Sequence, residues 1–202
     1  MSKLLTTLGL LLSTISGLAG QNLDLHFNLG RFTISDQRAI ELPSVGLNPN
    51  LGFFYQIDTH WSMGVSLNRS WNNYYRGSMA GTPIMVMPLP LEGTLTSDHF
   101  SFMVNRKLEL PFSILLEGGV GIGMYVDRNN YYAPVYFNED KQEYRGFFLI
   151  DEYSQGITFP AQFSLRKEFH NKWSIGIQGA VYYDQFFKRR GKNFGPRLGF
   201  YL

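Results

Sequence analysis

Two polar side chains with catalytic potential lie two positions apart, at His99 and Ser101. A histidine and a serine in contact can act as general base and nucleophile. If the segment is a strand, Phe100 points the other way and the two polar groups share one face. This spacing is a frequent coincidence, so we favour the alternative, a histidine and a serine in an internal polar network. The sequence therefore predicts no catalytic residue.

Charged and amide side chains recur on the polar faces of several alternating segments. If these segments close a narrow barrel, the charges enter a low-dielectric lumen and must be paired. We expect Glu117 and Arg197 to lie at similar heights and to interact directly or through Gln162 or Gln178. A gate or proton path is one interpretation and a structural plug is the other. We favour the plug, because a small barrel leaves little room beyond its side chains. The predicted lumenal network comprises Asp24, His26, Glu117, Gln162, Arg166, Gln178 and Arg197.

The composition gives little support for a metal site, a cofactor or a nucleic-acid partner. The chain has no cysteine, which excludes disulfides and thiolate metal sites. Apart from His99, no histidine lies near a second histidine or a carboxylate at metal-ligand spacing. The acidic residues between Glu139 and Glu152 lack the spacing of a calcium-binding loop. We expect neither a metal nor a cofactor, and the formal net charge of +2 argues against a nucleic-acid partner.

The elements that would position these residues are strands, because hydrophobicity alternates with a period of two along most of the chain. An aromatic content of 16% and abundant glycine suit many strands with tight turns. Alternating Leu23, Leu25, Phe27 and Leu29 give the pattern of the first strand. The predicted strands cover residues 23–30, 47–57, 61–68, 100–105, 113–124, 157–166, 173–181 and 193–202.

The predicted connections alternate in length. Short turns are expected near Asp58, at Lys107–Pro111 and at Glu168–Lys172. Long loops are expected at 34–46, 72–96, 127–154 and 184–192. This asymmetry is typical of transmembrane barrels, whose strands need about ten residues to cross a bilayer. The predicted fold is all-β, an eight-stranded antiparallel up-and-down transmembrane barrel with both termini at the short-turn end.

The composition of the two strand faces predicts which one meets lipid. A soluble barrel has the same alternation with its apolar side chains inward. Here the polar face carries Gly, Ser, Asn, Gln and Thr, with few charges and no lysine, which suits a crowded lumen better than water. The apolar face is bulky and is predicted to point outward. Trp61 and Trp173 at one end, and Trp71 with Tyr74 at the other, are predicted to form an interfacial aromatic belt.

The N-terminus has the features of a secretory signal. A basic start is followed by an apolar run from Leu4 to Ile15 and the small residues before Ala19. A membrane anchor is the alternative, but a spanning helix needs about 20 apolar residues. We predict a cleavable signal peptide over residues 1–19 and one barrel domain over residues 20–202.

The C-terminal segment Asn193–Leu202 ends the chain with an apolar, aromatic strand. Within it, a polar residue, a glycine and two spaced apolar residues resemble the assembly signal of small eight-stranded outer-membrane barrels, such as the outer-membrane protein A-like and X-like families. These residues are Asn193, Gly195, Leu198 and Phe200. The chain differs by continuing to Leu202, where many members end on Phe. The glycine-rich run Leu116–Gly123 is also similar to strands of these barrels. The resemblance implies location in the outer membrane of a Gram-negative cell and recognition by the barrel-assembly machinery.

Function is expected in the loops, because the scaffold is generic. We predict a non-catalytic outer-membrane protein that acts as a structural component or docks a partner at its surface. The alternatives are a lipid A-modifying enzyme and a narrow channel. Apolar runs at Ile84–Leu91 and Phe147–Ile150 either pack on one another in extended strands or form the docking surface. Contact with lipopolysaccharide phosphates is predicted for Lys188, Arg189, Arg190 and Lys192.

Overall fold

The computed structural model describes residues 23–34, 45–75, 92–138, 143–169 and 172–202. The predicted signal peptide and the apolar run Ile84–Leu91 lie outside the described residues. The strands are β1 (Leu23–Ile34), β2 (Val45–Gln56), β3 (Trp61–Tyr75), β4 (Glu92–Leu110), β5 (Ile114–Asn138), β6 (Glu143–Phe169), β7 (Trp173–Asp184) and β8 (Arg189–Tyr201). No helix in this part of the chain is long and apolar enough to cross a membrane.

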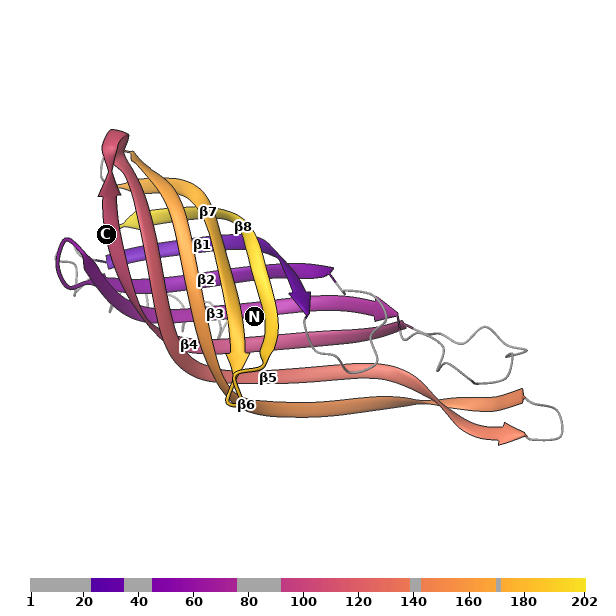
Figure 1. The fold of residues 1–202 in the computed structure, drawn as a ribbon. Helices are drawn as coiled ribbons and strands as arrows, with labels where there is room; N and C mark the ends of the chain where they lie inside the picture. The colour runs from indigo at the N-terminus through magenta and orange to yellow at the C-terminus, as the bar shows by residue number, and fades with distance from the viewer. Residues whose placement is uncertain (1–22, 35–44, 76–91, 139–142, 170–171) are drawn as a thin grey trace, which may run out of the picture.

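The strands form one closed barrel in chain order, with β8 returning to pair with β1 (Figure 1). Every neighbouring pair is antiparallel, and closure brings Asp24 opposite Tyr201 and His26 opposite Gly199. The backbones of Leu23 and Leu202 also exchange hydrogen bonds of 3.3 and 2.9 Å. Closure gives the edge strands partners, as a membrane barrel requires. The predicted eight-stranded up-and-down barrel is confirmed.

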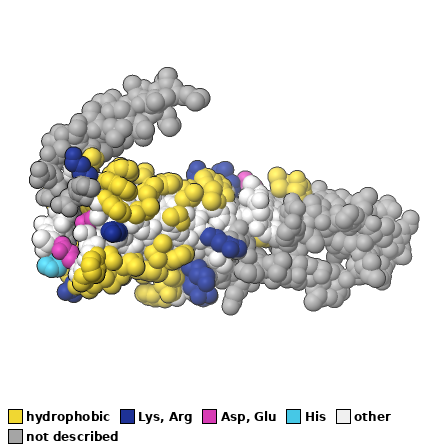
Figure 2. Space-filling model, turned by 90° about the horizontal axis from the view of Figure 1, so that it is seen from above, with side chains coloured by type: hydrophobic (Ala, Val, Ile, Leu, Met, Phe, Trp, Pro, Cys, Tyr) yellow, Lys and Arg dark blue, Asp and Glu magenta, His cyan; other side chains and the backbone are white. Residues whose placement is uncertain are grey.

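The apolar strand faces point outward and the polar faces point into the lumen. Phe100 on the wall is 54% exposed, whereas its lumenal neighbour Ser101 is 2% exposed. Figure 2 shows hydrophobic side chains spread over the wall, with Lys and Arg side chains gathered mainly near its edges. An apolar exterior around a polar interior matches a barrel surrounded by lipid and excludes a soluble barrel.

Several strands are longer than expected, which changes the connections. β5 continues to Asn138 and β6 begins at Glu143, so most of the predicted loop 127–154 is paired strand. Residues 127–131 also pair with β4, and the part beyond Tyr131 extends past β4 as two strands (Figure 1). We call residues 127–138 and 143–154 the ribbon. The predicted long loop 184–192 is instead a tight turn in which Asp184 accepts backbone hydrogen bonds. The predicted turn at Lys107–Pro111 lies later, at Pro111–Ser113. The alternating pattern was too weak at the strand ends to mark these limits.

Candidate functional site

A group of paired charges fills the lumen near the short-turn end. The Arg166 guanidinium lies between two carboxylates, with Nη1 2.7 Å from Asp24 Oδ2 and Nη2 3.1 Å from Glu117 Oε2. Arg197 lies on the other side of the same carboxylates, at 3.6 Å from Asp24 and 3.7 Å from Glu117. All four residues are at most 2% exposed. We call Asp24, Glu117, Arg166 and Arg197 the ion cluster.

The amide side chains extend the ion cluster along the lumen. Asn105 Nδ2 donates to Glu117 Oε1 at 2.8 Å, and Gln162 Nε2 donates to Asn105 Oδ1 at 3.0 Å. Gln178 in turn donates to Gln162 at 3.3 Å. The structure therefore brings Glu117 and Arg197 into direct contact and links the two glutamines to Glu117 through Asn105, a residue that the sequence interpretation did not single out.

His26 joins the ion cluster as a neutral acceptor. Its Nδ1 lies 2.9 Å from Arg197 Nη2, and an arginine can only donate, so Nδ1 must accept and the proton resides on Nε2. The ring stacks on Phe54 with centroids 5.1 Å apart. Arg197 also donates to Ser164 Oγ at 2.8 Å. Both rings and both hydrogen-bond partners of Arg197 are buried.

One lumenal charge was not expected. Lys107 is 3% exposed and its Nζ lies 3.9 Å from Asp24 and 3.5 Å from Gln56 Oε1. The expectation of a polar face without lysine is therefore wrong, because β4 continues to Leu110 and keeps Lys107 on its inward face. Lys107 also lines an open polar hollow of about 490 Å³ at the short-turn end, together with Gln56, Glu109 and Tyr201.

His99 and Ser101 both enter the lumen, but they do not form a catalytic pair. His99 Nε2 lies 3.0 Å from Ser97 Oγ, and Ser97 uses its hydroxyl hydrogen to donate to Asp127 at 2.5 Å. His99 Nε2 must then donate to Ser97, so it cannot act as a base toward it. Ser101 Oγ has no hydrogen-bond partner among the described residues. His99 therefore belongs to a polar network with Ser97 and Asp127, whereas Ser101 lies in the lumen outside that network.

Four buried aromatic rings lie close together in the lumen on the ribbon side of the amides. His99 lies 4.4 Å from Tyr182 between ring centroids, and Phe32 lies 6.0 Å from Tyr182. Tyr125 lies 6.2 Å from His99. All four rings are at most 8% exposed. This layer separates the ion cluster from the mouth at the ribbon end.

Arg190 departs from the lipopolysaccharide prediction. It forms an ion pair with Asp127, and its guanidinium lies 3.8 Å from the centre of the Tyr125 ring. A carboxylate and a ring inside the barrel thus hold a side chain that was expected to face headgroups, because opposite charge attracts it inward. Lys188, Arg189 and Lys192 are exposed near the β7–β8 turn. For these three residues, contact with lipid remains a prediction.

The tryptophans predicted for the belt lie on the outer wall at both ends of the barrel. Trp61 and Trp173 begin β3 and β7 at the short-turn end, and each is 42% exposed. Trp71 is 43% exposed near the other end of β3. Tyr74 is different, because it points inward and donates to Asn129 at 2.5 Å. Its position on the even-numbered face of β3 explains the difference.

The predicted assembly signal lies on β8, which closes the barrel. Asn193 and Gly195 face the lumen, whereas Leu198 and Phe200 are 44% and 53% exposed on the wall. Gly195 has a steric role of its own, because a Cβ there would collide with the backbone of Leu29 and Gly30. The alternation predicted for this segment is present, and recognition by assembly machinery stays a prediction.

Within the part of the chain that the structure describes, one edge of the ribbon has no strand beside it. β6 begins to pair with β7 only at Thr158, opposite Asp184, so residues 143–157 have no strand partner on that side among the described residues. Side chains along this edge include Leu149 at 58% and Tyr153 at 62% exposed. Within the predicted apolar run Phe147–Ile150, Phe148 and Leu149 do not pack in a core, since they are 48% and 58% exposed.

Comparisons with known proteins place the fold. A family model described as the putative MetA pathway of phenol degradation matches residues 121–202. No curated protein matches the chain. Among solved structures, Neisserial surface protein A is similar with a TM-score of 0.55 and 11% identity, covering 89% of this chain and 97% of that one. The attachment invasion locus protein of Yersinia pestis, solved with the heparin analogue sucrose octasulfate, gives a TM-score of 0.49 and 11% identity over 90% and 96%.

Proposed function

We propose that this chain, an outer-membrane β-barrel, has no catalytic activity, holds its lumen closed to ions, and docks a partner polypeptide on its ribbon. The β6 edge over residues 143–157, which has no strand partner on the β7 side in the described part of the chain, is the observation that carries the docking proposal. A strand edge presents a row of backbone N–H and C=O groups that another extended chain can satisfy. The exposed aromatic and aliphatic side chains on that edge would add apolar contact.

Two features support a closed lumen. The ion cluster and its amides occupy the barrel at one level, and the aromatic layer of Phe32, His99, Tyr125 and Tyr182 occupies it at another. An eight-stranded barrel is only just wide enough for its own side chains. This favours the plug over the gate or channel.

The separation of Ser101 from His99 argues against lipid A deacylation, the enzymatic alternative. A nucleophile needs a base within hydrogen-bond reach. The same residues also face the lumen, whereas acyl chains lie outside the wall. A cell expressing the protein should therefore have the same lipid A mass spectrum as a matched cell without it.

Docking on the ribbon can be tested by site-specific photo-cross-linking in intact cells. A photoreactive amino acid replaces Tyr153 on the free edge, or Phe163 on the lipid-facing wall of the same strand as the control. We expect a polypeptide adduct from position 153 and none from 163. Shortening the ribbon by joining Tyr131 to Ile150, which are paired, through an Asn-Gly turn should abolish binding of the captured protein to purified barrel. Equal adducts at both positions would contradict the proposal.

Lys188, Arg189 and Lys192 are proposed to contact anionic lipid at the ribbon-end boundary. They are exposed beside the wall, and basic residues at a membrane surface are attracted to anionic headgroups. Replacing all three with Ser should reduce lipopolysaccharide binding, while Arg190→Ser should not, because Arg190 is held by Asp127.

A further inference from the structure

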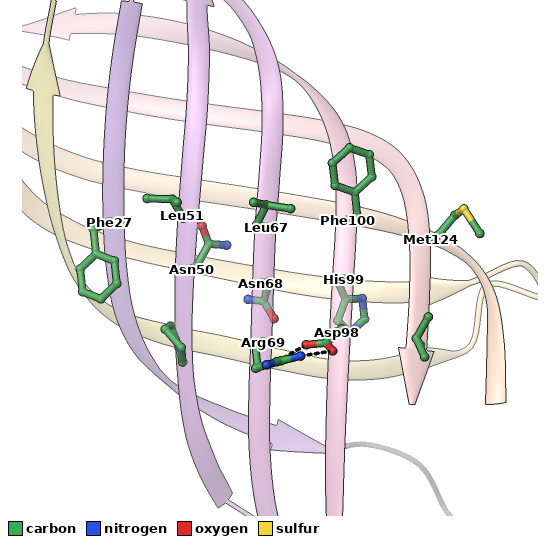
Figure 3. Close-up of a pocket in the computed structure, with 12 residues that line it drawn as sticks. Phe27, Asn50, Leu51, Leu67, Asn68, Arg69, Asp98, His99, Phe100 and Met124 are labelled. Carbon is green, nitrogen blue, oxygen red and sulfur yellow. Dashed lines mark hydrogen bonds and ion pairs between the residues drawn. The ribbon is translucent and has the colours of Figure 1, made fainter. Parts of the chain in front are cut away.

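An ion pair lies on the lipid-facing wall of the barrel. Arg69 on β3 and Asp98 on β4 are opposite each other and outside the lumen. Two hydrogen bonds join them, from Nε to Oδ1 at 2.5 Å and from Nη2 to Oδ2 at 2.6 Å, and their side chains are 53% and 41% exposed (Figure 3). A charge on this face is costly in a manner that depends on its depth in the bilayer. A polar group from the membrane would offset that cost.

The ion pair lies in a hollow of about 590 Å³ on the outer wall, within the size range of ligand sites. A continuous row of large apolar side chains from five neighbouring strands bounds it on the short-turn side, namely Phe27, Leu51, Leu67, Phe100 and Met124 (Figure 3). At the level of the ion pair, the neighbouring side chains that line the hollow are smaller than those of the apolar row, namely Pro49 and Val126. The hollow thus has an apolar side and a polar side, which fits an amphipathic occupant.

Trp71 sets the depth of the ion pair in the membrane. It is the next outward residue after Arg69 on β3, and its ring centre lies 5.8 Å from the Arg69 guanidinium carbon. Exposed tryptophans mark the boundary between hydrocarbon and headgroups. The ion pair therefore lies just inside the boundary at the ribbon end, with the apolar row deeper. A lipid placed there has its polar group at Arg69 and its chains along the row.

The Arg69–Asp98 pair is electrically neutral overall, and this neutrality determines which kind of lipid headgroup it can bind. Arg69 retains N–H donors on Nη1 beyond those used by Asp98, and the Asp98 carboxylate retains acceptor lone pairs. Sugar hydroxyls both donate and accept, so they can bridge the two side chains. A bare phosphate would be repelled by Asp98 as much as attracted by Arg69. We propose that this hollow binds the saccharide headgroup of a glycolipid, with its sugar ring beside Trp71 and its acyl chains on the apolar row.

The test uses barrel refolded from urea into zwitterionic detergent, which contains no cell lipid. Trp61→Phe and Trp173→Phe leave Trp71 as the fluorescent reporter. The probes are lipid A, a phosphorylated disaccharide with acyl chains, and phosphatidylglycerol, which has chains and phosphate but no sugar. We expect saturable binding of lipid A about tenfold tighter than phosphatidylglycerol, the size that hydrogen bonds to charged groups provide.

Arg69→Met with Asp98→Leu keeps the approximate side-chain size, removes every hydrogen-bonding atom of the pair and should reduce lipid A binding toward the level of phosphatidylglycerol. Arg106→Gln is the matched control, because Arg106 is an exposed arginine of β4 on the same outer wall, at the opposite end from the hollow. Lys188, Arg189 and Lys192 are unchanged in every variant. Any lipid binding by these three residues is therefore the same on both sides of each comparison. If the double variant fails to fold, as judged by its gel mobility before and after heating, Arg69→Lys removes the two-bond geometry alone and should also lower the preference. Equal affinity for the two lipids, no binding of either, or an unchanged preference in the variants would overturn the proposal.

Discussion

Arg166 and Asp24 are separated by 142 positions in the chain, yet they form a 2.7 Å ion pair across the lumen between β6 and β1. Closure of the barrel creates this contact, and Glu117 and Arg197 complete the ion cluster. Because the pair is buried, removing one partner leaves the other charge buried without a counter-ion. Removing a charge at the edge of the group need not have this effect.

Asp24→Ala should destabilise the barrel by about 3 kcal/mol or more, because Arg166 and Arg197 lose a shared partner in a buried site. The measurement is the urea dependence of unfolding in lipid vesicles, followed by tryptophan fluorescence. Asp151→Ala on the exposed ribbon is the control and should change stability by about 0.5 kcal/mol or less. Equal effects of the two substitutions would show that the ion cluster is not a cooperative part of the fold.

Lys107→Met should be far better tolerated than Arg166→Met. The lumenal group near Asp24 holds three cations, Lys107, Arg166 and Arg197, against the two carboxylates Asp24 and Glu117, and Lys107 has the longest ion pair, at 3.9 Å. Removing it leaves equal numbers of each sign, so we expect a change within about 1 kcal/mol, against about 3 kcal/mol for Arg166→Met. The same urea titration measures both, and a larger loss at Lys107 would contradict this account of the charge balance.

Arg197→Ser combined with Tyr182→Ala, which opens the ion cluster and the aromatic layer together, should convert a closed lumen into a leaky one. Arg197 is 1% exposed and contacts Glu117, Asp24, Ser164 and His26, so its loss removes the side chain that joins them. Planar-bilayer recordings should show no steady current for the natural protein and small open events for the variant. A large steady current from the natural protein would favour the channel instead.

Gly64→Ala should be costly and Gly118→Ala harmless. A Cβ at Gly64 would meet the backbone of Phe53 and Phe54 on the neighbouring strand, whereas nothing lies within 4 Å of one at Gly118. Overpacking of this kind typically costs about 1–3 kcal/mol. The fraction of folded protein on an unheated gel, measured against urea, should fall only for Gly64→Ala. Equal loss at both positions would point to strand propensity rather than to the close approach of the backbones.

Asp58 should make the β2–β3 turn sensitive to acid. Its Oδ1 accepts hydrogen bonds from the backbone N–H groups of His60 and Trp61, both at 2.7 Å, and these bonds lower the pKa of the carboxyl in the folded protein. The stabilisation is complete above the unfolded pKa of about 3.9 and is lost as pH falls through the lower folded pKa. The urea midpoints of the natural protein and Asp58→Ala should differ at pH 7 and converge in acid. A constant difference would show that the ionised form has no special role.

The sequence by itself determined the number of strands, the closed meander and the direction of each strand face. The alternating pattern determines the faces because successive side chains of an extended backbone point to opposite sides. Phe100 and Ser101 therefore had to lie on opposite faces of the strand. The lumenal positions of Asp24, Glu117, Arg166 and Arg197 followed from the same rule.

Only the tertiary structure decided which of these residues meet and where the strands end. Register and closure place Arg166 between Asp24 and Glu117, and draw Arg190 inward to Asp127. They also leave residues 143–157 of β6 without a partner on the β7 side among the described residues. Such contacts depend on the shear of the closed sheet and on charges brought together from distant strands, neither of which is encoded in a local pattern.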